Sequence, residues 1–200
     1  ELLLVSGVVH FPLTALLGFV ETLRGPAKED SAARERFLGI MEREAGRMAR
    51  LVDDLLSLSR VEENERLRPT EPVDLGELVA EVSEIFRPMA EQAGLELRLR
   101  LPPQPVVVSG DAEQLRQVLS NLLENAAKYG QGGDSVDISL SAPTPEPSLR
   151  SDGVRLAVRD HGEGIENHHL ARLTERFYRV DAHRPREVGG TGLGLAIVKH

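Results

Sequence analysis

Residues 1 to about 62 have apolar positions every three or four residues, the period of amphipathic α-helices. The first helix carries this stripe at Leu13, Leu16, Leu17, Val20 and Leu23. Gly25-Pro26 ends that helix, and Asp30 or Ser31 is a suitable cap for the next. The second stripe consists of Phe37, Ile40, Met41, Met48, Leu51, Val52, Leu55, Leu56 and Leu58. Two such helices joined by a short turn predict an antiparallel hairpin.

A lone hairpin of this kind leaves its apolar stripe in water. A dimer of two hairpins forms a four-helix bundle and buries both stripes. The alternative is that the stripe packs on the second half of the same chain. We expect a homodimer through a helical hairpin at residues 1–66, followed by a linker at 67–73, within a charged stretch interrupted by Pro69 and Pro72.

Residues 74–200 mix helical and strand patterns. Asp74 and Asp111 are predicted caps of helices that run to about Gln92 and Tyr129. Strands are predicted at 95–101, 106–108, 136–140 and 154–158, with a turn or loose excursion at 142–152. The chain is therefore predicted to be α+β, its second part an α/β sandwich with helices on one face of a mixed, mostly antiparallel sheet.

Composition narrows the classes of function. The chain is 40% hydrophobic and 28% charged, as ordinary globular proteins are. Its net charge of -8 argues against a nucleic-acid partner. The absence of cysteine excludes disulfides and thiolate metal sites and fits a reducing cytosol. The longest apolar run, Leu2 to Val5, is too short to cross a bilayer, so any membrane sensor region is expected upstream of this sequence.

The first of three candidate segments lies on the helix that ends near Tyr129. Asn121 and Asn125 share one helix face, with Lys128 one turn further on. An amide oxygen suits Mg²⁺, which takes few protein ligands and keeps waters and phosphates as the others. Lys128 can offer charge to a phosphate, and Tyr129 can flank a nucleotide. A face of this kind is also common as a merely solvated surface.

The second candidate segment follows a predicted strand and reads Asp160-His-Gly162-Glu-Gly164. Its glycines allow a sharp turn and a close approach to a ligand. A carboxylate at its start can accept a hydrogen bond from an exocyclic amine, such as that of adenine. By itself, this pattern is often only a turn.

The third candidate segment is a glycine-rich loop that opens a helix at 196–200. Free backbone amides and the helix dipole favour phosphates at such a position. The loop differs from a P-loop, since no Gly-Lys-Ser/Thr follows, and from a dinucleotide fingerprint, since a βαβ unit is missing. Its residues include Gly190, Thr191, Gly192, Leu193 and Gly194.

In this order and spacing, the three segments resemble the ATP-binding domain of the gyrase, chaperone and histidine-kinase superfamily. Within it they are similar to the histidine kinase branch, as is the stretch Arg176-Phe-Tyr178-Arg179. The resemblance covers residues 74–200, and the hairpin extends it to the whole chain. It implies a bacterial two-component sensor histidine kinase that binds ATP and Mg²⁺, phosphorylates a histidine and passes the phosphoryl group to a response regulator receiver domain. It also implies the cytoplasmic portion of an inner-membrane sensor.

The resemblance assigns roles to individual residues. It implies that Asn125 holds Mg²⁺, that Asp160 reads adenine, and that Lys128, Tyr178 and Arg179 lie near the phosphates or a lid. The lid would run from about residue 173 to 190, and the family continues beyond this sequence with a further helix and strands. Gyrase-type ATPases carry a glutamate base four residues before the magnesium-binding asparagine. This chain has Asn121 there, so transfer to a protein side chain fits better than ATP hydrolysis.

The phosphoacceptor motif of this family, His-Glu/Asp-Leu-Arg-Thr-Pro, is altered here. Aligned on Pro12, the acceptor position holds Gly7, the base position Val8 and the threonine position Phe11. His10 stands three residues after Gly7, about 60° round the helix and about 4.5 Å along it. Three hypotheses remain: His10 is a shifted acceptor, the chain is a kinase-dead ATP-binding scaffold, or the segment is engineered or misassigned.

Overall fold

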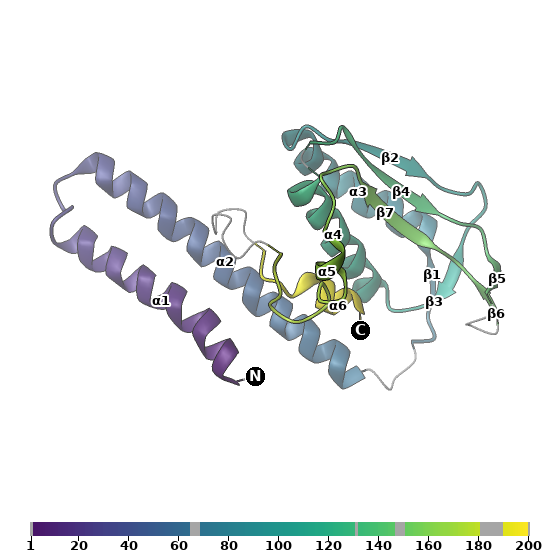
Figure 1. Cartoon of the computed structure of the whole chain (residues 1–200), viewed down its shortest axis with the longest axis horizontal. Coiled ribbons are helices and arrows are strands. Elements are labelled where there is room, and N and C mark those ends of the chain that lie inside the picture. The colour runs from purple at the N-terminus through teal and green to yellow at the C-terminus, as the bar shows by residue number, and fades with distance from the viewer. Residues whose placement is uncertain (1, 65–68, 131, 147–150, 181–189, 200) are drawn as a thin grey trace. The chain divides into compact units, whose positions relative to one another are not determined.

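The computed structural model describes residues 2–64, 69–130, 132–146, 151–180 and 190–199, without the side chains of residues 2–12, 64, 146 and 151. The chain forms two compact units, at Glu1–Ser57 and Leu58–His200 (Figure 1). Within the described ranges, no helix combines the length and the apolar character that a membrane span requires.

The first unit is built on the predicted hairpin. Helix α1 (Leu2–Arg24) and helix α2 (Ser31–Asn64) run antiparallel, with the turn between them. The Asp30 carboxylate accepts a hydrogen bond from the Ala33 amide at 2.9 Å, so Asp30 caps α2 as predicted. The rings of Phe19 and Phe37 meet across the two helices, with their centroids 5.6 Å apart.

Among the residues that the structure describes, the second unit contains three sheets. The largest has the strand order β2-β4-β7, with β2 parallel to β4 and β4 antiparallel to β7. Strand pairs β1-β3 and β5-β6 are both antiparallel. This confirms a mixed sheet. The elements in chain order are β1 (Pro72–Asp74), α3 (Leu75–Gln92), β2 (Glu96–Arg100), β3 (Val107–Ser109), α4 (Ala112–Tyr129), β4 (Ser135–Leu140), β5 (Thr144–Glu146), β6 (Ser151–Gly153), β7 (Leu156–Asp160), α5 (Asn167–Leu170) and α6 (Gly194–Lys199).

Helices α3 and α4 lie side by side on one face of the β2-β4-β7 sheet (Figure 1). Both begin at the predicted caps, because Asp74 and Asp111 accept hydrogen bonds from amides of the following turn. Apolar side chains one turn apart on each helix meet alternate side chains of β2 and β4. The buried core contains Leu78, Val79, Val82, Phe86, Ala90, Leu97, Leu119, Leu123, Ala126, Val136 and Ile138.

Two stretches that we expected to lack regular structure contain short strands. Pro72 and Val73, at the end of the expected linker, belong to β1, which pairs with β3 and brings Val73 against the core. The segment expected as a turn or loose excursion contains β5 and β6, which pair with each other as antiparallel strands. Thr144 to Glu146 and Ser151 to Gly153 carry no apolar alternation, which is why the sequence pattern gave no strand signal there.

Candidate functional site

Helix α4 has an apolar face and a polar face. Leu119, Leu123 and Ala126 point into the core, whereas Asn121 and Asn125 lie on the opposite side, two residues out of phase. The polar face meets α6, and the C-terminal end of α4 meets the loop after β7. The segments that the sequence singled out therefore meet around the C-terminal half of this helix.

Asn121 is only 8% exposed, and the protein engages both atoms of its amide. Its Nδ2 donates to the Gly194 carbonyl at 3.2 Å, and its Oδ1 accepts from Gln117 Nε2 at 3.3 Å. A Cβ atom at Gly194 would lie 3.4 Å from the amide carbon and oxygen of Asn121, so a side chain there would crowd this contact. Asn121 thus ties the glycine-rich loop at residues 190–194 to α4. We call this loop the second glycine loop, and the loop at residues 160–164 the first glycine loop.

Replacing Asn121 with alanine is expected to lower the free energy of unfolding by about 1–2 kcal/mol, because the change removes a largely buried hydrogen bond to the Gly194 carbonyl. Urea unfolding followed by circular dichroism measures this. Gln117→Ala is the matched control, since it removes only the bond to Asn121 Oδ1 and should cost less. Equal losses in the two variants would contradict the assigned tie.

The protein buries and hydrogen-bonds three further candidate residues to different extents: Asn125, Lys128 and Tyr129. Asn125 is half-buried, and its amide makes no hydrogen bond with the residues that the structure describes. Lys128 Nζ lies 2.7 Å from Glu124 Oε2, one turn back on α4. The Tyr129 side chain is exposed, and its hydroxyl lies 3.7 Å from where a Cβ of Gly190 would be. Tyr129 therefore lies beside the start of the second glycine loop.

The first glycine loop begins at the end of β7 and packs on the end of α4. Asp160 Oδ1 accepts a hydrogen bond from the Gly162 amide at 3.0 Å, which closes a tight turn. A Cβ atom at Gly162 would lie 2.3 Å from the Tyr129 carbonyl oxygen, a distance that no side chain tolerates. Gly164, by contrast, has open space around it and a φ of 78°. Gly162 is therefore required by close packing, whereas Gly164 is required by its backbone conformation.

The second glycine loop is fixed to Phe177, which the sequence marked only as part of the stretch from Arg176 to Arg179. Phe177 donates its amide hydrogen to the Gly192 carbonyl at 2.8 Å, and its φ of 62° is unusual for an aromatic residue. Gly192 has a φ of 75°, and a Cβ there would lie 2.8 Å from Phe177 Cα. The Thr191 hydroxyl accepts from the amide of Leu193, whose side chain is fully buried.

Tyr178 and Arg179 follow Phe177 directly. The Tyr178 hydroxyl lies 2.5 Å from His169 Nδ1, and the Arg172 guanidinium lies 4.2 Å from the Tyr178 ring centroid. Arg179 Nε is buried without a hydrogen-bond partner among the described residues. The rest of the expected lid, residues 181–189, lies outside the described residues.

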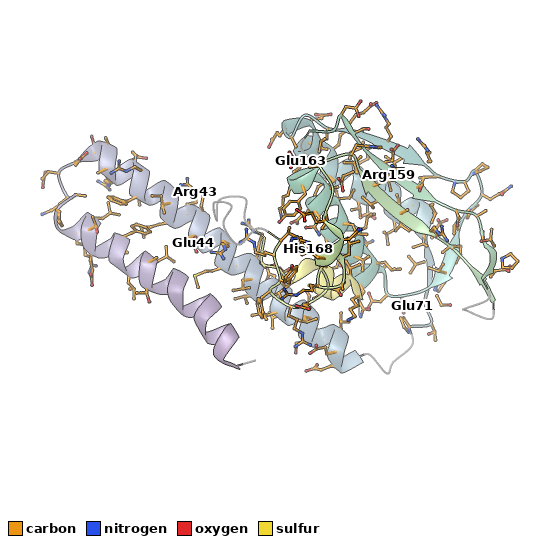
Figure 2. All side chains as sticks on the ribbon, viewed as in Figure 1. Arg43, Glu44, Glu71, Arg159, Glu163 and His168 are labelled. Carbon is orange, nitrogen blue, oxygen red and sulfur yellow. The ribbon has the colours of Figure 1, made fainter. Side chains whose placement is uncertain are left out.

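Figure 2 labels Glu163 on the first glycine loop and His168 on α5, within the same unit as α4. Gly7, Val8 and His10 lie on α1, but the side chains of Val8 and His10 fall outside what the structure describes. Sequence reasoning missed several positions that shape the loops. The run Gly130-Gln-Gly132-Gly133 was a visible turn signal, whereas Asp137 gave none, and Phe177 was marked only as part of the stretch from Arg176 to Arg179.

Two family models match the chain. The model of histidine kinase-, DNA gyrase B- and HSP90-like ATPases matches residues 110–200, and the His kinase A (phospho-acceptor) domain matches residues 11–64. The second match begins at Phe11, so Gly7, Val8 and His10 lie outside it.

Curated proteins and solved structures agree with these matches. The phosphate regulon sensor protein PhoR of Pseudomonas aeruginosa is 38% identical over 98% of this chain and 42% of its own length. The Acinetobacter baumannii histidine kinase AdeS has a TM-score of 0.67 at 28% identity, covering 95% of this chain and 82% of that chain. The mycobacterial sensor histidine kinase MprB is 33% identical, with a TM-score of 0.50, over 65% of this chain and 76% of that chain.

A further solved structure shares the fold at 21% identity and a TM-score of 0.68, over 88% of this chain and 49% of that chain: histidine kinase ThkA in complex with response regulator protein TrrA. The chain spans less than half the length of the curated relatives it matches. Matches to both domain models, together with these likenesses, show that the chain belongs to the sensor histidine kinase family.

Proposed function

We propose that the chain is the core of a two-component kinase that binds Mg-ATP, phosphorylates a histidine and passes the phosphoryl group to a response regulator aspartate. In this proposal residues 1–66 dimerise and present the histidine, 67–73 link, and 74–200 bind ATP. The observation that carries it is the convergence on α4 of two glycine loops, one through the Tyr129 carbonyl and one through the Asn121–Gly194 bond.

The free polar groups of the site fit a nucleotide with its metal. Asn125 offers an amide oxygen without a partner among the described residues, which suits a Mg²⁺ ion. Asp160 uses Oδ1 for its own turn, which leaves Oδ2 for the adenine amino group. Arg179 Nε is a buried donor that a phosphate oxygen would satisfy. Bound Mg²⁺ would neutralise charge on the phosphates as the terminal phosphoryl group leaves.

The remaining residues complete the proposed site. Lys128 and Tyr178 would flank the phosphates or the lid, and Tyr129 would flank the nucleotide. The backbone amides of Gly190, Thr191, Gly192, Leu193 and Gly194 would face the phosphates, held in place by Asn121 and Phe177. Gly162 and Gly164 would allow the first glycine loop to turn tightly beside the adenine. In the transfer step the histidine nitrogen attacks the γ-phosphorus, a P–N bond forms, the bond to the bridging oxygen breaks, and ADP leaves.

The hairpin supports a proposed homodimer. Leu13, Leu17, Leu38, Val52 and Leu56 are large apolar side chains that remain exposed, Leu17 to 65%. A second hairpin would bury them in a four-helix bundle. By analogy with the ThkA–TrrA complex, we propose a response regulator receiver domain as the second partner. We further propose that these residues form the cytoplasmic part of an inner-membrane sensor.

The acceptor motif supports a second candidate function, a kinase-dead scaffold that binds ATP, because the acceptor and base positions hold Gly7 and Val8. The test is incubation with γ-labelled ATP and Mg²⁺, with acid-labile label and free phosphate followed separately. We expect the Gly7→His, Val8→Glu chain to be labelled roughly 100-fold faster than the unaltered chain, since it regains an acceptor and its base.

The other outcomes separate the alternatives. Label on the unaltered chain that His10→Ala abolishes would identify His10 as a shifted acceptor. Nucleotide binding without acid-labile label, even in the Gly7→His, Val8→Glu chain, would support the scaffold and contradict the kinase. Free phosphate released without protein label would instead support an ATPase.

A further inference from the structure

Asp137 is a partly buried carboxylate on the sheet face opposite to the helices. Its neighbours Val136 and Ile138 on β4 point into the core, so the side chain of Asp137 emerges on the other face. Oδ2 lies 2.7 Å from His161 Nε2, and Oδ1 lies 3.2 Å from Arg100 Nη2. The Asp137 side chain is only 17% exposed, whereas that of Arg100 is 73% exposed. The bond to His161 is thus the better shielded of the two.

His161 stands between Asp160 and Gly162, in the middle of the first glycine loop. Because an ionised carboxylate only accepts hydrogen bonds, Nε2 of His161 carries the proton. The hydrogen bond from His161 holds the pKa of Asp137 below its ordinary value, with a smaller contribution from Arg100. The bond therefore has an ionised acceptor at neutral pH, the stronger kind.

Three contacts together fix this loop. A Cβ atom at Gly133 would lie 2.8 Å from the His161 carbonyl oxygen, so the backbones of Gly133 and His161 are in close contact, which only a glycine permits. On the other side the His161 ring is bonded to Asp137, and Asp160 Oδ1 holds the Gly162 amide. In the register of β4 and β7, Asp160 lies opposite Val136, and Asp137 lies opposite Arg159. Figure 2 labels Arg159.

We propose that Asp137 and His161 are positioning residues for purine selection, which hold the loop so that the Asp160 carboxylate faces the amino group of adenine. This inference rests on the proposed function, in which Asp160 accepts from that amine. Hypoxanthine carries a carbonyl oxygen in place of the amine, so two hydrogen-bond acceptors would face each other. A well-held Asp160 therefore rejects inosine nucleotides strongly, and a loosened one rejects them less.

The test measures Kd for ADP and for IDP, both with Mg²⁺, on the full 200-residue chain. In Asp137→Ala and His161→Ala we expect the preference for ADP over IDP to fall roughly 5- to 10-fold. His161→Gln keeps an N–H donor near the position of Nε2 and should retain the preference to within about twofold. The double alanine variant should be no worse than either single variant, because both remove the same bond.

The controls separate this inference from the proposed function. Ser139→Ala changes the same face of β4 two residues away and should leave the ratio unchanged, and thermal melts check that each variant is folded. A loss of affinity equal for ADP and IDP in Asp137→Ala would mean a merely structural role and would overturn the inference. Asp160→Asn should remove the preference; if it does not, the proposed adenine contact itself is wrong. If the preference for ADP over IDP is lost in Asp160→Asn but kept in Asp137→Ala, the adenine contact stands and only the positioning role is overturned.

Discussion

Replacing Asn125 with alanine is expected to abolish the contribution of magnesium to nucleotide binding while the chain stays folded. The Asn125 amide makes no hydrogen bond with the described residues, so its loss leaves no protein partner unsatisfied. We expect the free energy of unfolding to change by no more than about 0.5 kcal/mol. In the Gly7→His, Val8→Glu chain, labelling from γ-labelled ATP should slow at least about 100-fold, because the metal is worth several kcal/mol in such a step.

Calorimetric titration with ADP distinguishes a metal ligand from a nucleotide contact. With Mg²⁺ present, Asn125→Ala should bind ADP more weakly than the unaltered chain, and with EDTA the two should bind equally. Gln114→Ala removes an amide from the same helix near its opposite end and serves as the matched control. A loss of affinity that persists in EDTA would show that Asn125 does not act through the metal.

Replacing Gly192 with alanine is expected to destabilise the chain more than the same change at Gly94. The two glycines have nearly the same φ, 75° and 74°, so both variants bear the cost of a left-handed alanine, about 1–2 kcal/mol. Gly94 has no atom within 4 Å of an added Cβ, whereas at Gly192 that atom would lie 2.8 Å from Phe177 Cα. We expect this overlap to cost a further 1–3 kcal/mol, approximately.

Urea unfolding of the two variants measures the difference directly. Nucleotide binding provides the second readout, because the Phe177 amide bonds the Gly192 carbonyl and the overlap must displace one of these loops. Gly192→Ala should therefore bind ADP at least about tenfold more weakly, and Gly94→Ala should bind it normally. Equal unfolding free energies and equal affinities in the two variants would refute the contact between these loops.

The helices were predictable because their signals are local. Asp30, Asp74 and Asp111 each cap the helix that the sequence assigned to them, since a cap needs only the next few amides. The short strands β5 and β6 were not predictable, because their pairing leaves no apolar alternation in the sequence. The predicted bounds of the long strands were within two residues of those observed.

The candidate site was predictable as a set of motifs but not as a set of contacts. The sequence marked Gly162 as a turn residue, but the Tyr129 carbonyl that requires it lies on another element. Asp137 and His161 are 24 residues apart and meet only through the β4-β7 register. The positive φ of Phe177 depends on its hydrogen bond to Gly192, which no local pattern encodes.

Helix α4 packs in the core with one face and carries candidate site residues on the other, and this limits how far its length can vary. One inserted residue turns all that follows on a helix by about 100° and moves it about 1.5 Å. An insertion between Leu119 and Leu123 would therefore turn the Asn125 amide, the proposed Mg²⁺ ligand, towards the sheet and move Leu123 off the core. Exchanges of side chains are therefore expected to be better tolerated in this helix than insertions or deletions.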